Sequence, residues 1–240
     1  MKKVTGIIDH RILINYRVDP DVMQRVLPEG FEPKLVNGYA IGGICQVSLS
    51  QMRPKGLPAG LGTSSHNAAH RIAVKCAQGE GVYVPRRDTN SFLNTLSGGR
   101  LFPGAYSKAD FDITQSSDHY RLHIENNTSG IILSIEAEIC KEISPTSIFK
   151  STDDISTFFK SGNMGWSPNT STTSSKTYDA IELITEKWNM TPMCASKTYS
   201  GFFSNTETFP EGAVEFDSAM IMKNIPHSWV AKDESTLTCC

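Results

Sequence analysis

Alternation of apolar and polar residues dominates the chain, and it predicts a protein built mainly from β-strands. In a strand, successive side chains point to opposite faces, so one face can be buried while the other stays polar. Short turns rich in Ser, Asp, Asn and Gly separate the alternating segments between residues 109 and 141, which indicates an antiparallel meander. The segments with a strand pattern are His10–Tyr16, Tyr39–Gln51, Ala109–Ile113, His119–Glu125, Ile131–Lys141, Tyr178–Trp188, Lys197–Ser204 and Glu215–Lys223.

A few short helices interrupt the strand pattern, and capping residues predict where they begin. Asp19 can accept hydrogen bonds from the free amides of a first turn, and Pro20 suits the first helical position of a helix that ends near Leu27. A second helix is expected over Asp88–Leu96, before a pair of glycines. A third begins at Thr152 and two acidic residues.

Turn residues define the connections between these elements. Asn37-Gly38 is the strongest hairpin signal, because both residues tolerate the positive φ angles of a type I′ turn. Gly42-Gly43, inside the next strand, indicates a bulge or a close approach of backbones. Long loops are expected over Arg53–Gly60, which is rich in Pro and Gly, and over Asn163–Lys176, which is rich in Ser, Thr, Asn and Gly.

Length and charge narrow the classes of protein that fit. A chain of 240 residues without a convincing linker is expected to form one domain, residues 1–240, with a core that needs no disulfide or metal. The formal net charge of -2 argues against nucleic acid and anionic membranes as partners. No apolar run reaches the roughly 20 residues that span a bilayer, and the first residues lack a signal-peptide pattern. We therefore expect a cytoplasmic protein.

Cysteine and histidine spacing gives no metal prediction. The six cysteines form no CxxC pair, so reduced thiols are expected, with Cys45 and Cys76 as small core residues. His66 and His70, like His119 and His123, have a spacing that occurs in metal sites on helices. In a strand, the second pair would share a face with Arg121, which would repel a cation, so a polar face of the sheet is the better interpretation. No metal or other cofactor is expected.

Two segments resemble a known family. The run INYRVDPDVMQRVLPEGFEPKLVNGYAIGGICQVSLSQMRPKGLP, Ile14–Pro58, is similar to the start of acetoacetate decarboxylase and of a sister family known by an unknown-function label. The run GGRLFPGAYSKADFDI, Gly98–Ile113, resembles the motif of Gly, Arg, an apolar pair and a Pro-centred turn in these families. The resemblance implies a closed or nearly closed antiparallel barrel with a few short helices, enclosing a small keto acid or similar molecule.

The resemblance also identifies where the chain departs from the decarboxylase chemistry. Acetoacetate decarboxylase carries two adjacent lysines after the Pro turn, one of which forms a Schiff base while the other lowers its pKa, an example that also illustrates the general rule for activated amines. The corresponding residues here are Ala105, Tyr106 and Ser107, followed by Lys108. Only a shifted alignment would make Lys108 the reactive amine, and no second lysine stands beside it. Lys108 is therefore predicted not to form a productive Schiff base.

The remaining candidate residues follow from the same alignment. The loop Gly62–His70 occupies the place where the sister family has Ser, Glu and Asn, but this chain has Asn67 instead of the acid and keeps Arg71. Arg71 could hold a substrate carboxylate through its bidentate fork or form a surface salt bridge. Tyr106 could donate to a carbonyl or fill the core. Asn67, Arg71, Arg100 and Phe102 are thus predicted to bind substrate, and Tyr106 and Lys108 to take part in catalysis. Arg86-Arg87 is interpreted as a solvated turn.

Two functions remain open at this point. One is an enzyme of the lyase, isomerase or cyclase type that acts on a small carbonyl compound. The other is a ligand-binding barrel without catalytic activity. In both, the partner is a small molecule, and a homo-oligomer is possible.

Overall fold

The computed structural model describes residues 3–91, 106–169, 177–232 and 235–236. The predicted β-rich class is confirmed, because strands account for most of the described chain. The helices are α1 (Pro20–Val26), the 3-10 turn η1 (Ala59–Leu61) and α3 (Thr152–Lys160). The strands are β1 (Lys3–Val18), β2 (Glu32–Pro33), β3 (Leu35–Val36), β4 (Tyr39–Pro54), β5 (Thr63–Cys76), β6 (Gly79–Thr89), β7 (Tyr106–Lys108), β8 (Asp110–Ser116), β9 (His119–Asn126), β10 (Gly130–Ile139), β11 (Met164–Pro168), β12 (Thr177–Thr185), β13 (Thr191–Ser200), β14 (Val214–Ala231) and β15 (Ser235–Thr236).

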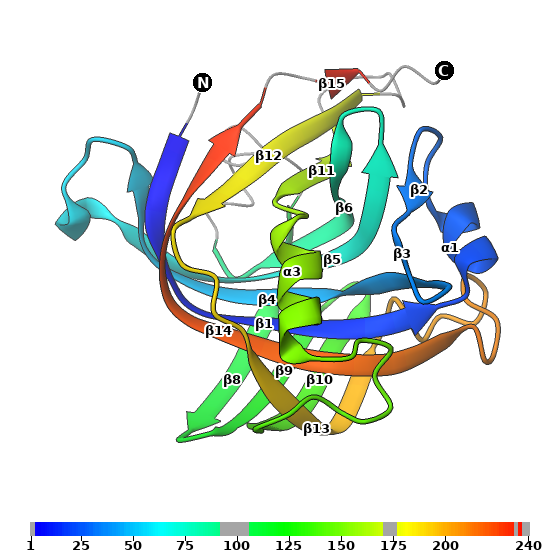
Figure 1. The fold of residues 1–240 in the computed structure, drawn as a ribbon. Coiled ribbons are helices and arrows are strands. Elements are labelled where there is room, and N and C mark those ends of the chain that lie inside the picture. Colours follow the sequence, from blue (N-terminus) through cyan, green and yellow to red (C-terminus); the bar gives the residue numbers. More distant parts are fainter. Residues whose placement is uncertain (1–2, 92–105, 170–176, 233–234, 237–240) are drawn as a thin grey trace.

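Seven strands pair in a closed sequence, which we call the seven-strand ring. The pairing runs β12, β11, β6, β5, β4, β1 and β14, and β14 pairs again with β12 through residues 227–231 and 181–185. Figure 1 shows β1, β4 and β14 side by side across the middle of the molecule, with β11 and β12 above them in this view. The ring therefore brings together segments from the beginning, middle and end of the sequence.

The sheet is mixed, which corrects the prediction of an antiparallel architecture. Most pairings are antiparallel, but β6 pairs in parallel with β7 and with β11. Alternation has the same period in both kinds of pairing, and only a short turn forces two strands to be antiparallel. Strand direction was therefore predictable for the hairpins and not for strands that meet from distant parts of the chain.

The meander between residues 110 and 139 extends the sheet beyond the ring. Strands β8, β9 and β10 pair in chain order, and β10 continues through β13 to β14. The three predicted strands of this region are confirmed with boundaries shifted by a few residues. The shifts are the usual uncertainty of strand ends.

Local signals near the N-terminus are confirmed. The side chain of Asp19 accepts hydrogen bonds from the backbone amides of Asp21 at 2.9 Å and Val22 at 3.0 Å, which caps α1. Asn37 and Gly38 have φ angles of 50° and 86° in the turn between β3 and β4. Gly43 lies against β1, where a Cβ atom would come within 2.2 Å of the Ile14 carbonyl oxygen, so the predicted close approach is present.

Three local predictions differ from the structure. The expected helix over Asp88–Leu96 is wrong over residues 88–91, where Asp88 and Thr89 end strand β6 and the next two residues are not helical; residues 92–96 lie outside the described residues. The expected loop over residues 163–176 contains β11, because Trp166 is fully buried against Gly81. The loop over residues 53–60 begins only after β4 ends at Pro54, and it includes the start of η1.

The cap of α3 and one pair of cysteines also differ. Ser151 rather than Thr152 caps the helix, by accepting from the amide of Asp154 at 3.1 Å. Cys140 and Cys194 form a disulfide, so the expectation of reduced thiols is wrong for this pair. These two residues are 54 positions apart and meet because β10 and β13 are neighbours in the sheet, which no sequence spacing reveals.

The hydrophobic core has two parts on opposite faces of the long strands. The part inside the ring contains Leu13, Val47 and Met220 and is completed by Ile155 and Phe159 of α3. The other part contains Ile12, Ile14 and Ile44 and packs against the meander and the aromatic residues around Phe203. Among the described residues, no helix is long and apolar enough to cross a membrane.

Candidate functional site

A cavity of about 140 Å³ lies inside the seven-strand ring. Every strand of the ring contributes at least one lining residue, and Tyr106 of β7 adds another. Most of the wall is apolar, with side chains such as Val47, Leu49 and Trp229. An apolar cavity with a few placed polar groups is the usual form of a small-molecule site.

The most buried polar residue of the cavity is Arg71, and a row of residues across four strands positions it. The backbone register places Arg71 of β5 beside Gly43 of β4, Gly43 beside Asn15 of β1, and Asn15 beside Ser218 of β14. Because Gly43 has no side chain, the long side chain of Arg71 can reach Asn15, whose Oδ1 accepts from Nη2. Asn15 in turn donates from Nδ2 to Ser218 Oγ at 3.1 Å. The row fixes the guanidinium from one side.

The other nitrogens of this guanidinium have no hydrogen-bond acceptor among the residues that the structure describes. Arg71 is only 3% exposed, and its Nε and Nη1 atoms are buried without a hydrogen-bond acceptor among the described residues. The guanidinium lies 4.4 Å from the centre of the Phe159 ring in α3. Burial lowers the pKa of Arg71 to about 9, with a further lowering by Arg11 and an opposite effect of Cys45. Arg71 is therefore a buried cation in the wall of the cavity, with two donors that no described residue satisfies.

A second arginine lies close to the first. Arg11 of β1 donates from Nε to Cys45 Sγ at 3.2 Å and stacks 5.3 Å from the centre of the Trp188 ring. Its Nη1 atom is also buried without a partner among the described residues. Both Arg11 and Cys45 line the cavity. Arg11 carries no signal in the sequence that predicts this position, and Cys45 was expected to be a small core residue.

A third arginine lines the cavity beside the predicted tyrosine. Arg87 donates to Ser167 Oγ at 2.8 Å from Nη2, and it lies 5.8 Å from the centre of the Tyr106 ring. Burial raises the pKa of Tyr106, while Arg87 acts in the opposite direction, so the phenol is protonated at neutral pH and can donate a hydrogen bond. The solvated turn expected at Arg86-Arg87 is wrong, because both residues belong to β6 and Arg86 pairs with the buried carboxylate of Asp88 at 2.9 Å.

The charges around the cavity are of one sign. Arg11, Arg71 and Arg87 line it, and no Asp, Glu or Lys does so among the described residues. Within the same part of the chain, none of these three arginines forms an ion pair. Buried charges in proteins are normally paired, so an anion bound in the cavity would supply the partner that these arginines do not find among the described residues.

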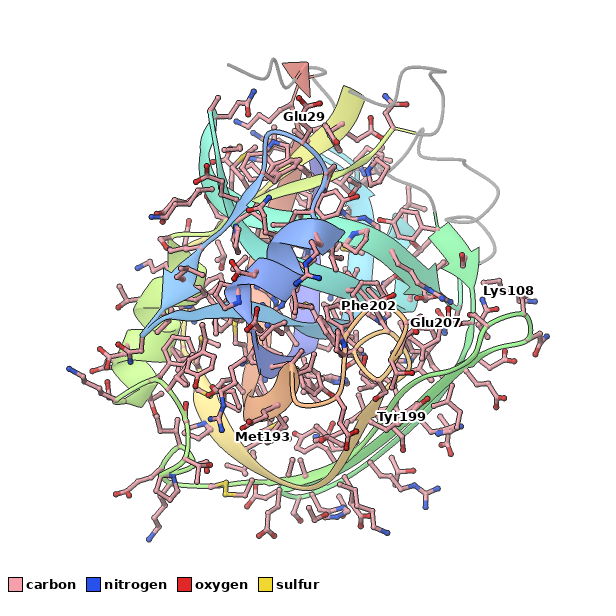
Figure 2. The ribbon with its side chains drawn as sticks, turned by 90° about the vertical axis from the view of Figure 1, so that its right-hand side faces the viewer. Glu29, Lys108, Met193, Tyr199, Phe202 and Glu207 are labelled. Atoms are coloured by element: carbon pink, nitrogen blue, oxygen red, sulfur yellow. A yellow bond between two sulfur atoms is a disulfide. The ribbon has the colours of Figure 1, made fainter. Side chains whose placement is uncertain are left out.

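The residues predicted for the site separate into three groups. Asn67, Arg71 and Tyr106 line the same cavity, and Asn67 donates from Nδ2 to Ser65 Oγ at 2.9 Å. Lys108 is exposed and is not among the residues that line this cavity; Figure 2 shows its side chain at the outer edge of the meander. Ser107 and Lys108 follow Tyr106 in β7, a short strand that pairs with β6 of the ring, and both are exposed. Arg100 and Phe102 lie outside the described residues.

The histidines considered as metal ligands are used differently. His66 Nδ1 lies 2.7 Å from Ser48 Oγ, which is also 2.9 Å from His10 Nε2. His70 is buried against Phe202, with a ring-centre distance of 5.1 Å. His119 and His123 lie on β9 near Glu136 and Glu125 respectively. Within the described ranges, no group of three or more His, Cys, Asp or Glu residues is arranged to hold a metal ion.

The sequence matches the model of a known protein family. A family model named DUF2071 and described as "Uncharacterized conserved protein" matches residues 8–193, well over half of the chain. No curated protein gives a significant sequence match.

Several solved structures have a similar fold at low sequence identity. An acetoacetate decarboxylase from Legionella pneumophila has a TM-score of 0.60 at 12% identity, covering 96% of this chain and 87% of that one. The enduracididine biosynthesis enzyme MppR complexed with pyruvate has a TM-score of 0.65 at 8% identity, covering 100% and 91%. An acetoacetate decarboxylase-like enzyme from Sphingomonas wittichii has a TM-score of 0.61 at 11% identity, covering 100% and 94%. The chain belongs to the DUF2071 family, and its fold is similar to that of acetoacetate decarboxylase.

Proposed function

We propose that this protein is an acetoacetate decarboxylase-like enzyme that binds a small organic carboxylate inside a barrel formed by the seven-strand ring. The guanidinium of Arg71 is the observation that carries the proposal, because it is buried, forms no ion pair with the described residues, and finds no acceptor among them for Nε and Nη1. A charge held in an apolar interior without a partner costs several kcal/mol, and a bound carboxylate would remove that cost. The partner is thus a small molecule with one negative group.

The geometry assigns separate tasks to the polar residues. Arg71 offers two donors without an acceptor among the described residues, Nε and Nη1, and since they lie on different edges of the guanidinium, each would donate to a carboxylate together with the neighbouring Nη2. Tyr106, with its pKa raised by burial, would donate a hydrogen bond to a carbonyl oxygen of the same ligand. Asn67 adds an amide to the wall. A keto acid has both groups within one small molecule, and the similar fold of MppR in its complex with pyruvate supports this class.

The reaction would proceed without a lysine Schiff base. No lysine lines the cavity among the described residues, and Lys108 is exposed. Lyase or isomerase chemistry would then depend on polarisation of the carbonyl by Tyr106 and on the positive field of the arginines. This field stabilises the negative charge that develops on the oxygen of an enolate.

The first experiment measures binding. We expect pyruvate or acetoacetate to raise the melting temperature of the protein, and pyruvamide and acetone to leave it unchanged, because only the acids offer an anion. In Arg71→Met, affinity for the acid should fall by on the order of tenfold to a hundredfold, the usual effect of losing hydrogen bonds to a charged group.

Arg121→Met is the matched control. Arg121 is an exposed arginine on β9, 3.5 Å from Asp112, and it does not line the cavity. Its loss should leave the affinity unchanged. Equal stabilisation by the acids and by their neutral analogues, or equal weakening in both variants, would show that Arg71 is not the anion site.

A non-catalytic ligand-binding protein is the second candidate, favoured by the lack of a lining lysine in the described part of the cavity. The two candidates differ in whether the bound acid exchanges protons. An enzyme that polarises the carbonyl should catalyse the exchange of the methyl protons of pyruvate in heavy water, observed by proton NMR, and should lose this activity in Tyr106→Phe. Binding without exchange would favour the second candidate.

A further inference from the structure

We propose that Cys45 is a nucleophile of the cavity, directed at small carboxylates that carry an electrophilic carbon. The proposal rests on the proposed function, because the same arginines must hold the carboxylate. It adds a residue to which neither the resemblance nor the comparisons assign a role.

The position of Cys45 in the strand places its sulfur in the cavity. Along β4, Gly43, Cys45 and Val47 share the face that looks into the ring, and Cys45 pairs with Ala69 of β5, which also lines the cavity. Since Ala69 has a short side chain, it leaves space in front of the sulfur. Cys45 is a free thiol of intermediate exposure.

Two guanidinium groups surround this sulfur. Arg11 Nε donates to Cys45 Sγ at 3.2 Å, and Cys45 acts electrostatically on Arg71. Reactive cysteines typically lie in such electropositive and partly accessible surroundings. The other free cysteine in the described residues, Cys76, instead donates from Sγ to Gln78 Oε1 at 3.1 Å, and burial raises its pKa.

The arginines also provide a reason for a carboxylate to approach Cys45. Among the described residues, two donors of Arg71, which is 3% exposed, and one donor of Arg11 have no acceptor, so an anion bound between them would lie next to the sulfur. In an addition to a ketone, the C–S bond forms as the C=O π bond breaks, and the oxygen takes up the proton that the thiol has lost. No oxidant, reductant or metal is needed for this step. The adduct would take the place of the Schiff base that the fold relatives with lysine can form.

Alkylation with a charged and a neutral reagent tests the proposal. Iodoacetate and iodoacetamide form the same kind of C–S bond with release of iodide, but only iodoacetate carries a carboxylate. We expect the ratio of the two alkylation rates, iodoacetate over iodoacetamide, to be at least about tenfold higher at Cys45 than at Cys76, since a hydrogen-bonded charge pair contributes about 1.5–3 kcal/mol. Peptide mapping by mass spectrometry measures both sites in one sample.

Variants and a competitor identify the origin of the preference. Arg71→Met and Arg11→Met should each lower the ratio at Cys45 toward that at Cys76, whereas Arg121→Met should leave it unchanged. Pyruvate should protect Cys45 of the unmodified protein and pyruvamide should not, a comparison that does not depend on how the variants fold. Equal ratios at Cys45 and Cys76, or no protection by pyruvate, would overturn the proposal.

The outcome can be separated from that of the proposed function. Cys45→Ala should still be stabilised by pyruvate if the arginines bind the carboxylate, although the site has lost its thiol. Binding of pyruvate together with an unreactive Cys45 would overturn this inference alone. Absence of pyruvate binding in both the unmodified protein and Cys45→Ala would overturn the proposed function as well.

Discussion

At the scale of single residues, His70 shows how the fold uses a titratable group as part of its core. The imidazole is 1% exposed, packs between Phe202 and Phe203, and has no hydrogen-bond partner on either ring nitrogen among the described residues. Burial lowers its pKa to about 3, and the positive charge of Arg86 acts in the same direction. His70 is therefore neutral in the folded protein over the physiological pH range.

This burial predicts a loss of stability in acid. The unfolded chain binds a proton at His70 below a pH of about 6.5, whereas the folded protein does so only near pH 3, so the free energy of unfolding falls as pH decreases between these values. In His70→Leu, the fall should be smaller by about 1.4 kcal/mol per pH unit, the contribution of one proton. Urea unfolding at pH 7, 6 and 5 measures it. Identical slopes in His70→Leu and the unmodified protein would contradict the assignment.

The residues of the candidate site were only partly predictable from the sequence. Arg71, Tyr106 and Asn67 were selected because local motifs resemble a family, and all three line one cavity. Arg11 and Cys45 carry no motif, since their proximity results from the register of β1 with β4. That Arg11 and Cys45 both point into the ring and lie close together can be seen only once the pairing of β1 with β4 is known. Lys108 was selected for its chemistry, although it is the exposed last residue of a three-residue strand.

At the scale of elements, helix α1 has the clearest local cause. It has only seven residues, and a helix of this length depends on its cap and its packing rather than on its own hydrogen bonds. Val22 and Met23 are buried, and the carboxylate of Asp19 satisfies two amides of the first turn. The side chain of Asp19 thus fixes the point at which β1 passes into the helix.

Removal of this cap should have a measurable cost. Asp19→Ala should lower the free energy of unfolding by about 1 kcal/mol, because the amides of Asp21 and Val22 lose their acceptor. Asp21→Ala is the matched control, since it removes a carboxylate from the same turn without removing the cap, and its effect should be a few tenths of a kcal/mol. Chemical denaturation of the three proteins provides the comparison. Equal losses for both substitutions would assign the effect to helix charge instead of capping.

Elements that are specified by adjacent residues were predicted, and those specified by distant contacts were not. The turn at Asn37-Gly38 and the meander of β8, β9 and β10 need only their own residues. Strand β11 consists of Met, Gly, Trp, Ser and Pro, a composition that resembles a loop, and it becomes a strand because it is paired on both sides by β6 and β12. Likewise, Asp88 ends a strand because its carboxylate is buried beside Arg86. Tertiary packing overrides local preference in both cases.

At the scale of the whole molecule, one covalent loop contains the elements that complete the ring. The disulfide between Cys140 and Cys194 closes a loop of 54 residues, which includes α3, β11 and β12. Helix α3 contributes Phe159 below Arg71, and β12 joins β11 to β14. The integrity of the cavity therefore depends on a segment whose two ends are tied together. The cytoplasmic location predicted from the sequence would favour the reduced form of this bond, because reducing compartments keep thiols free.

Reduction should thus weaken the ring more than it weakens the meander. A crosslink over 54 residues restricts the unfolded chain by about 4 kcal/mol in the loop-closure model, and measured values are commonly about 2–4 kcal/mol. We expect dithiothreitol to lower the free energy of unfolding of the oxidised protein by about this amount, and to have no effect on a variant with both Cys140→Ala and Cys194→Ala. Hydrogen exchange followed by mass spectrometry should show the larger gain in the peptides of β11 and β12, which lie inside the loop, and a smaller gain in those of β8 and β9, which lie outside it. An unchanged stability on reduction, or a uniform gain in exchange over all strands, would mean that the closure of the ring is maintained by its packing and its hydrogen bonds alone.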